Sequence, residues 1–176
     1  MLIRKRLFLL LPLILAMQPA WAAFSDGAVA CSMGQYEKAY NILRSIAETT
    51  NDVHTPLAEY YLGMMYMNGQ GVKLDYGKAS EWFRKAAEKS LPEAQYKLGT
   101  LYFNGQGVPR DYERAYAWYR VASVHNHQLS KKALPRAKEN LSTAELKDAE
   151  KLSREYIEKY GPKKGDNKEP RDINKQ

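Results

Sequence analysis

The sequence predicts an all-α protein: a short right-handed α-α superhelix (solenoid) of helix-turn-helix repeats that ends in a C-terminal capping helix. Two observations predict this fold. The stretch Asn-Gly-Gln-Gly-Val at residues 68–72 returns unchanged at residues 104–108, and self-similarity at a fixed period of about 20–50 residues is typical of repeat arrays. On both sides of each copy, apolar residues also recur at the three- and four-residue spacing of a helix face.

The match between residues 58–93 and 94–129 extends well beyond the shared loop, at a constant separation of 36 residues. The identical pairs include Ala58/Ala94, Tyr60/Tyr96, Leu62/Leu98, Gly63/Gly99, Tyr66/Tyr102, Asp75/Asp111, Tyr76/Tyr112, Ala79/Ala115, Trp82/Trp118, Arg84/Arg120 and Ala86/Ala122. Each copy therefore has the length of one helix-turn-helix unit.

The loop of each copy is predicted to be a structural turn. Glycine adopts positive φ without a steric penalty, so it can end one helix and reverse the chain within a few residues. The turn glycines are Gly69, Gly71, Gly105 and Gly107. Asp75 and Asp111 follow as predicted N-caps of the second helices, in which Trp82 and Trp118 are expected to fill the space between helices.

Gly63 and Gly99 stand in the middle of the first helices. A glycine there costs about 1 kcal/mol relative to Ala. Its recurrence in both copies therefore predicts a close approach between neighbouring helices.

These residues together form the pattern Ala-x-x-x-Leu-Gly-x-x-Tyr-x-Asn-Gly-x-Gly-Val-x-x-Asp-Tyr-x-x-Ala-x-x-Trp, which resembles the Sel-one-like repeat, a relative of the tetratricopeptide repeat. The resemblance implies an α-solenoid. It also implies an adaptor function, because proteins of this family generally act as scaffolds, often in envelope, secretion or host-contact systems.

Residues 1–22 have the features of a secretory signal peptide. Arg4, Lys5 and Arg6 form a positive segment, residues 7–17 are apolar apart from Pro12, and Ala-Trp-Ala at 20–22 is a cleavage pattern. The apolar run is too short to span a bilayer, which takes about 20 residues. We therefore expect a periplasmic or secreted protein, cleaved near Ala22 and without stable membrane insertion. The compact signal together with the resemblance to the Sel-one-like repeat family implies that it is bacterial.

The positive charge of the chain does not indicate a nucleic-acid partner. Of the net charge of +7, three charges lie in the predicted signal peptide and two more in residues 162–176. The remaining excess is small, and export also argues against nucleic acid.

The remaining segments are interpreted by their relation to the repeats. Residues 23–55 are an atypical first helix pair, followed by repeats at 56–91 and 92–127. Residues 128–160 are the C-terminal capping helices, in which Pro135 is expected to kink a helix or start a new turn, and Ser142 to open the last helix with a capping box. Residues 161–176 are expected to be a disordered tail.

The sequence gives no catalytic, cofactor or metal assignment. The glycine loops lack the Gly-Lys-Ser/Thr of a phosphate-binding loop. His125 and His127 do not share a helix face, since i and i+2 positions diverge, and are expected to be solvated. Cys31, the single cysteine, is expected to be a small buried hydrophobe of the first helix, with pairing between chains as the minor alternative.

The candidate binding residues lie on the polar side of the first helices, which usually forms the concave binding face in stacked helix pairs. They are Tyr61, Met64 and Asn68 in one repeat and Lys97, Thr100 and Asn104 in the next. Simple exposure to solvent is the equally weighted alternative.

The leading hypothesis is therefore an exported, non-enzymatic scaffold that binds a peptide or protein partner on its concave face, with its oligomeric state left open. The alternative is a cell-wall (peptidoglycan) binder or a β-lactam hydrolase, like some cysteine-rich exported relatives. Those relatives have paired cysteines in each repeat, which this chain lacks.

Overall fold

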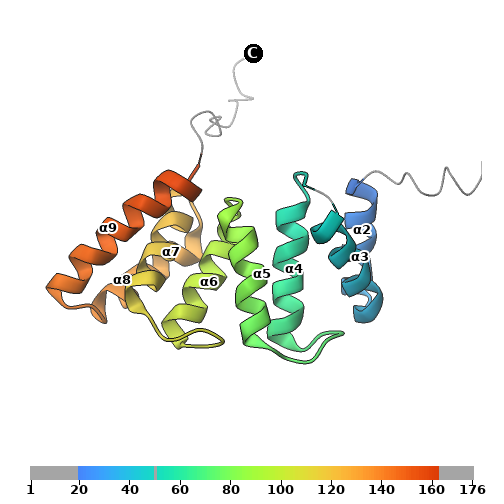
Figure 1. Cartoon of the computed structure of the whole chain (residues 1–176), viewed down its shortest axis with the longest axis horizontal. Helices are drawn as coiled ribbons and strands as arrows, with labels where there is room; N and C mark the ends of the chain where they lie inside the picture. The colour runs from blue at the N-terminus through green and yellow to red at the C-terminus, as the bar shows by residue number, and fades with distance from the viewer. Residues whose placement is uncertain (1–19, 50, 163–176) are drawn as a thin grey trace, which may run out of the picture.

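The computed structural model describes residues 20–49 and 51–162, which form helices joined by turns and loops. The predicted signal peptide lies outside these residues apart from its last three, and the predicted tail lies outside them from residue 163 onward. The helices are α2 (Ala20–Ser32), α3 (Tyr36–Thr49), α4 (Thr55–Asn68), α5 (Tyr76–Glu88), α6 (Pro92–Asn104), α7 (Tyr112–Val124), α8 (Gln128–Glu139) and α9 (Thr143–Tyr160). They follow one another in a row from α2 to α9, and the predicted all-α fold is confirmed (Figure 1).

The helices pack as sequential pairs, α2 with α3, α4 with α5 and α6 with α7, and each pair packs on the next through α3 and α4 or through α5 and α6. The last two helices depart from this pattern, because α8 and α9 both pack on α7. In addition, α8 touches α6 and α9 touches α5. The helix α8 therefore continues the row of first helices (α2, α4 and α6), whereas α9 covers the outer helix α7.

The long loops within the two repeats dock each repeat on the one before it. Gly69 and Gly105 end α4 and α6 with φ of 66° and 68°, and Gly71 and Gly107 both have φ of 69°. A Cβ at Gly71 would lie 2.7 Å from the carbonyl carbon of Tyr36, and one at Gly107 would overlap the carbonyl group of Tyr76. Both loops lie at the same edge of the molecule (Figure 1) and press on the first residue of the preceding second helix.

The second helices begin at side-chain caps, as the sequence predicts. Asp75 accepts a hydrogen bond from the Lys78 amide at 2.9 Å, and Asp111 accepts one from the Arg114 amide at 2.8 Å. An acidic or polar cap of this kind satisfies one of the backbone amides that a helix start leaves unpaired. Ser142 opens α9 in a complete capping box with Glu145.

The mid-helix glycines bring each first helix against an aromatic ring of its own second helix. A Cβ at Gly63 would lie 2.7 Å from the Phe83 ring, and a Cβ at Gly99 would lie 2.9 Å from the Tyr119 ring. Both rings are almost fully buried. The close approach predicted from the recurrence of the two glycines is therefore present in both repeats.

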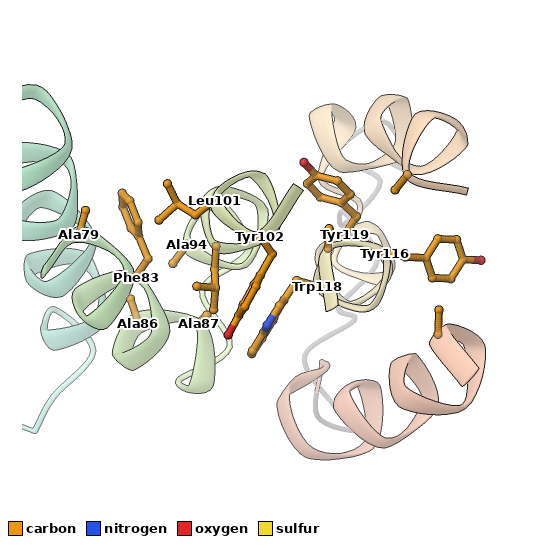
Figure 2. Packing of buried hydrophobic residues seen from close by; sticks show 14 of the residues in the cluster. Ala79, Phe83, Ala86, Ala87, Ala94, Leu101, Tyr102, Tyr116, Trp118 and Tyr119 are labelled. Carbon is orange, nitrogen blue, oxygen red and sulfur yellow. The ribbon is translucent and has the colours of Figure 1, made fainter. Parts of the chain in front are cut away.

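The two equivalent tryptophans differ in burial. Trp118 is 2% exposed and lies beside Tyr102 (Figure 2), where Tyr156 and Tyr160 of α9 cover it at ring-centroid distances of 4.7 and 5.5 Å. Trp82 packs on both apolar clusters of the core but stays half-exposed. The difference follows from α9, which covers the outer side of α7 far more than that of α5.

Helix α8 continues through Pro135, so the alternative in which this residue starts a new turn is wrong. Proline lacks an amide hydrogen and removes one backbone hydrogen bond. Pro135 itself is exposed, so water can reach the carbonyl group that this leaves free. Within residues 20–49 and 51–162, none of the helices has the length and apolar character to cross a membrane.

Candidate binding groove

A groove lies between α6 and α8, with α7 beneath it. Its volume is about 300 Å³, and it is lined by Tyr96, Thr100, Phe103, Asn104, Tyr119, Leu129, Lys132, Ala133 and Arg136. We call this set of residues the α6–α8 groove. It lies on the side of the molecule formed by the first helices, where a repeat array usually holds its partner.

The floor of the groove is a hydroxyl pair that the first repeat lacks. Tyr119 donates a hydrogen bond to the Thr100 hydroxyl at 3.2 Å, and Thr100 donates to the carbonyl group of Tyr96 at 3.0 Å. The equivalent residues of the first repeat are Phe83 and Met64, which carry no hydroxyl. Both positions therefore carry a hydroxyl in the second repeat and none in the first. In the second repeat, the hydrogen bond between the two hydroxyls gives the groove a polar, fixed floor.

Burial raises the pKa of the Tyr119 hydroxyl above its ordinary value of 10.0, and the charge of Arg136 partly offsets this effect. Tyr119 is therefore neutral at physiological pH and acts as a hydrogen-bond donor.

The rim is basic and aromatic. Lys132 and Arg136 project from α8, and the Arg136 guanidinium lies 4.8 Å from the centroid of the Phe103 ring, within the range of a cation–π contact. A second recess, lined by Phe103, Asn104, Arg110, Tyr112, Arg136 and Asn140, shares three residues with the first and extends the groove toward the Gly105 turn. No acidic side chain lines either recess.

Helix α8 is held in place by residues at its start. His127 is its N-cap and accepts a hydrogen bond from the Ser130 amide at 3.3 Å, and its ring lies 5.1 Å from the Tyr96 ring. Burial lowers the pKa of His127 below its ordinary value of 6.5, so the imidazole is neutral and able to accept. His127 therefore links the start of α8 to Tyr96 of α6, which lines the groove.

The six predicted binding residues do not form one site. Thr100 and Asn104 line the α6–α8 groove, whereas Lys97 lies half-exposed on α6 outside its lining. Tyr61 packs on Phe24 of α2 at a ring distance of 6.0 Å, and Met64 is half-buried against the main core cluster.

The asparagines Asn68 and Asn104 have a shared local role. Each side chain donates to the glutamine two residues later, Asn68 to Gln70 at 3.4 Å and Asn104 to Gln106 at 3.1 Å. Both bonds lie within the Gly-x-Gly turns. This role explains why asparagine occurs in both repeats, and it leaves the amide oxygen of Asn104 available to the groove.

Four lining residues come from α8 and are not among the predicted binding residues: Leu129, Lys132, Ala133 and Arg136. A signal for them is present in the sequence. They recur at helical spacing on one face, and α8 has Lys131, Lys132, Arg136 and Lys138 against a single acid, Glu139. The sequence predicts this helix only as a cap, although a helix that continues the row of first helices also borders the face that they form.

The prediction that His125 and His127 are solvated is wrong, because both are half-buried. The Nε2 atom of His125 lies 3.4 Å from the Tyr160 carbonyl oxygen, and His127 is the helix cap described above. Cys31 is partly buried on α2, and burial raises the pKa of its thiol. In the part of the chain that the structure describes, no group of three His, Cys, Asp or Glu side chains is arranged to hold a metal ion.

Comparison with known proteins agrees with the stack of helix pairs described above. The Sel1 repeat family matches residues 56–91 and 92–123. The crystal structure of a protective antigen of uropathogenic Escherichia coli that displays an SLR fold is similar, with 35% sequence identity and a TM-score of 0.77 over 84% of this chain. A Sel1 repeat protein from Oxalobacter formigenes is similar at 28% identity, with a TM-score of 0.60 over 76% of this chain.

This chain spans 32% of the length of the Escherichia coli protein and 54% of that of the Oxalobacter protein. A comparison with curated proteins gave no match. The boundaries of the family repeats coincide with the helix pairs α4–α5 and α6–α7. The chain is a scaffold of stacked helix pairs and belongs to the Sel1 repeat family.

Proposed function

We propose that this protein is an exported, non-enzymatic scaffold that binds a peptide or protein partner on the face formed by its first helices. The observation that carries the proposal is the α6–α8 groove. Its floor of Tyr119 and Thr100 is fixed by hydrogen bonds, while its rim exposes the apolar Leu129 and the bases Lys132 and Arg136. A fixed floor with exposed contact residues favours binding, because little conformational entropy is lost when a partner docks.

The absence of enzymatic activity is part of the proposal. It is motivated by the roles of the residues that recur in both repeats, which are caps, turns or packing residues: Asp75 and Asp111 cap helices, and Gly71 and Gly107 dock loops. Nitrocefin hydrolysis and co-sedimentation with peptidoglycan test the enzymatic and cell-wall alternatives. We expect neither, and turnover of nitrocefin that depends on Cys31 would contradict this part of the proposal.

Export is supported by the signal-like residues 1–22. The similar Escherichia coli protein is described as a protective antigen, which favours a location outside the cytoplasm for this chain as well. Cell fractionation of the natural host tests this location, and recovery of an uncleaved chain from the cytoplasm would contradict it.

Binding is tested with the wild type and two matched variants, each immobilised and exposed to an envelope extract of the host. The groove variant combines Leu129→Ala with Lys132→Ala, and the control variant combines Val124→Ala with Arg120→Ala. Each variant removes one exposed apolar side chain and one exposed base, so both should fold like the wild type.

We expect the wild type and the control to enrich the same partner, and the groove variant to recover about tenfold less, because it loses one apolar and one basic contact with the partner. Equal recovery by all three proteins would place the binding site elsewhere. No protein enriched above bare resin would contradict the proposed function itself.

A further inference from the structure

We propose that the α6–α8 groove selects an extended peptide segment in which acidic side chains flank an apolar one. This inference rests on the proposed function and adds the chemical class of the partner. It starts from the charge of the groove, whose rim residues Lys132 and Arg136 form no ion pair among the described residues, while the ion pairs of the described chain involve Arg44, Lys89 and Arg114. The positive charge at the rim is therefore not neutralised from within the protein.

The basic residues are arranged in a way that suits carboxylates. Lys132 and Arg136 are four residues apart on α8, one helical turn, and both are exposed. The Arg136 guanidinium lies 4.8 Å from the centroid of the Phe103 ring, a cation–π contact that leaves its N–H donors without a carboxylate partner among the described residues. A guanidinium of this kind binds a carboxylate through two parallel hydrogen bonds.

Apolar surface alternates with the basic residues. Leu129 is 52% exposed, and Ala133 lies one turn after it on the same face of α8, beside Lys132. Across the groove, Tyr96 and Phe103 supply aromatic surface from α6. A partner side chain that enters between the two helices would therefore be apolar, with its acidic neighbours at the rim.

Asn104 adds a group that can form a hydrogen bond with a peptide backbone. Its amide nitrogen donates to Gln106 within the turn, so the amide oxygen remains able to accept from a backbone N–H. Thr100, by contrast, already accepts from Tyr119 and donates to Tyr96. An extended segment exposes unpaired backbone amides, whereas a helix has already used most of its own.

Charge argues against two other occupants. The C-terminal residues 163–176 contain more bases than acids, and the folded part of this chain also has a small positive excess. Neither the tail nor a second copy of the chain therefore complements a basic groove. Arg110 contributes less to the positive charge of the groove than Lys132 and Arg136 do, because it also lines a recess that contains Glu113 and Glu145.

The test uses a random peptide library displayed on phage, selected on the full-length mature protein. Two charge-reversal variants are compared with the wild type: Lys132→Glu/Arg136→Glu in the groove and Lys147→Glu/Lys151→Glu on α9. All four residues are exposed and both variants change the net charge equally, so folding and overall charge are matched. Selected peptides are then synthesised with fluorescein, together with a Gln-for-Glu and a Lys-for-Glu version of each.

We expect the wild type to select peptides in which acidic residues surround an apolar position. The Gln version of such a peptide should bind the wild type about tenfold more weakly, because two charge-assisted contacts are lost. The original peptide should bind the groove variant with a similar loss of affinity and the α9 variant with none. The Lys version should bind the groove variant better than it binds the wild type. Peptides without acidic enrichment, or equal losses for both variants, would overturn the inference.

Two further outcomes would also overturn it. Tighter binding of oligothymidine than of the selected peptides would make the groove a nucleic-acid surface. A library that yields no peptide would contradict the acidic-segment inference. The proposed function would still stand in that case if the envelope extract gives a partner whose recovery depends on Leu129 and Lys132. Failure of both experiments would contradict the proposed function.

Discussion

At the scale of single residues, glycines at matching backbone conformations have different neighbours. Gly34 and Gly107 have φ of 73° and 69°, so an alanine at either position meets the same left-handed strain of about 1 kcal/mol. A Cβ at Gly34 meets no atom within 4 Å, whereas one at Gly107 overlaps the carbonyl group of Tyr76. A substitution at Gly34 therefore measures the energetic cost of backbone strain alone, whereas one at Gly107 adds the cost of a steric clash between repeats.

We expect Gly34→Ala to lower the free energy of unfolding by about 1 kcal/mol and Gly107→Ala to lower it by about 3 kcal/mol, since overpacking adds roughly 1–3 kcal/mol to the strain. Urea denaturation followed by circular dichroism measures both values. Equal losses at the two positions would mean that the Gly105–Gly107 turn does not dock on α5.

Glu59 is a buried carboxyl on α4. Its side chain is 2% exposed and pairs with Lys89, which lies at the end of α5 and is 37% exposed. One oxygen, Oε2, is buried without a hydrogen-bond partner. Burial raises the pKa of Glu59 above its ordinary value of 4.5, against the opposing effect of Lys89. The pair is therefore a place where protonation and stability are linked.

A carboxyl whose pKa is raised by folding contributes stability that is fully present below its unfolded pKa and is lost as pH rises through the folded pKa. We therefore expect the free energy of unfolding of the wild type, relative to that of Glu59→Gln, to decrease as pH rises from 4.5. Urea denaturation at several pH values measures this difference, with the exposed Glu81→Gln as control. A difference that increases with pH would show that pairing with Lys89 outweighs burial.

At the scale of secondary structure elements, α9 determines the environment of Trp118. The rings of Tyr156 and Tyr160 cover the indole, and the Gln95 side chain donates to the Tyr160 carbonyl group at 3.0 Å and to that of Ala87 at 3.1 Å. The end of α9 is thereby tied to α5 and α6. The helix closes the apolar end of the stack, where another repeat would otherwise be needed.

In a Trp21→Phe/Trp82→Phe background only Trp118 emits, because the chain has three tryptophans. We expect Tyr156→Ala to shift this emission to longer wavelength and to lower the free energy of unfolding by about 2 kcal/mol, less than the 3–5 kcal/mol of a fully buried aromatic residue. Tyr61→Ala, on α4, should leave the emission unchanged. An unshifted spectrum for Tyr156→Ala would contradict the cover by α9.

The elements that the sequence predicts well are those whose signals are local and repeated. Caps such as Asp75, turns such as Gly69 and the helix stripes depend on residues close in the chain. The packing of α9 on α7 and α5 depends on residues far apart in the chain, which a single sequence does not reveal. Thr100 and Asn104 of the groove follow from the repeat, whereas Arg136 lies in a capping helix outside it, and its helical spacing alone does not place it beside α6.

At the scale of the whole molecule, the stack presents two faces with different roles. The outer side is covered over α7 by α9, whereas the face of the first helices leaves the α6–α8 groove open. Stability in such an array comes from contacts between neighbouring helix pairs, so residues on the open face are free to vary. The difference between Met64 and Thr100, two partly exposed positions of the first helices, shows such variation within one chain.

Site-specific photo-crosslinking in the native host shows whether the proposed partner docks on the face of the first helices. A benzophenone side chain replaces Leu129, in the groove, or Arg120, exposed on the outer helix α7. The account predicts that illumination gives a discrete adduct from position 129 and none from position 120. An adduct from position 120 alone, or the same adduct from both, would contradict it.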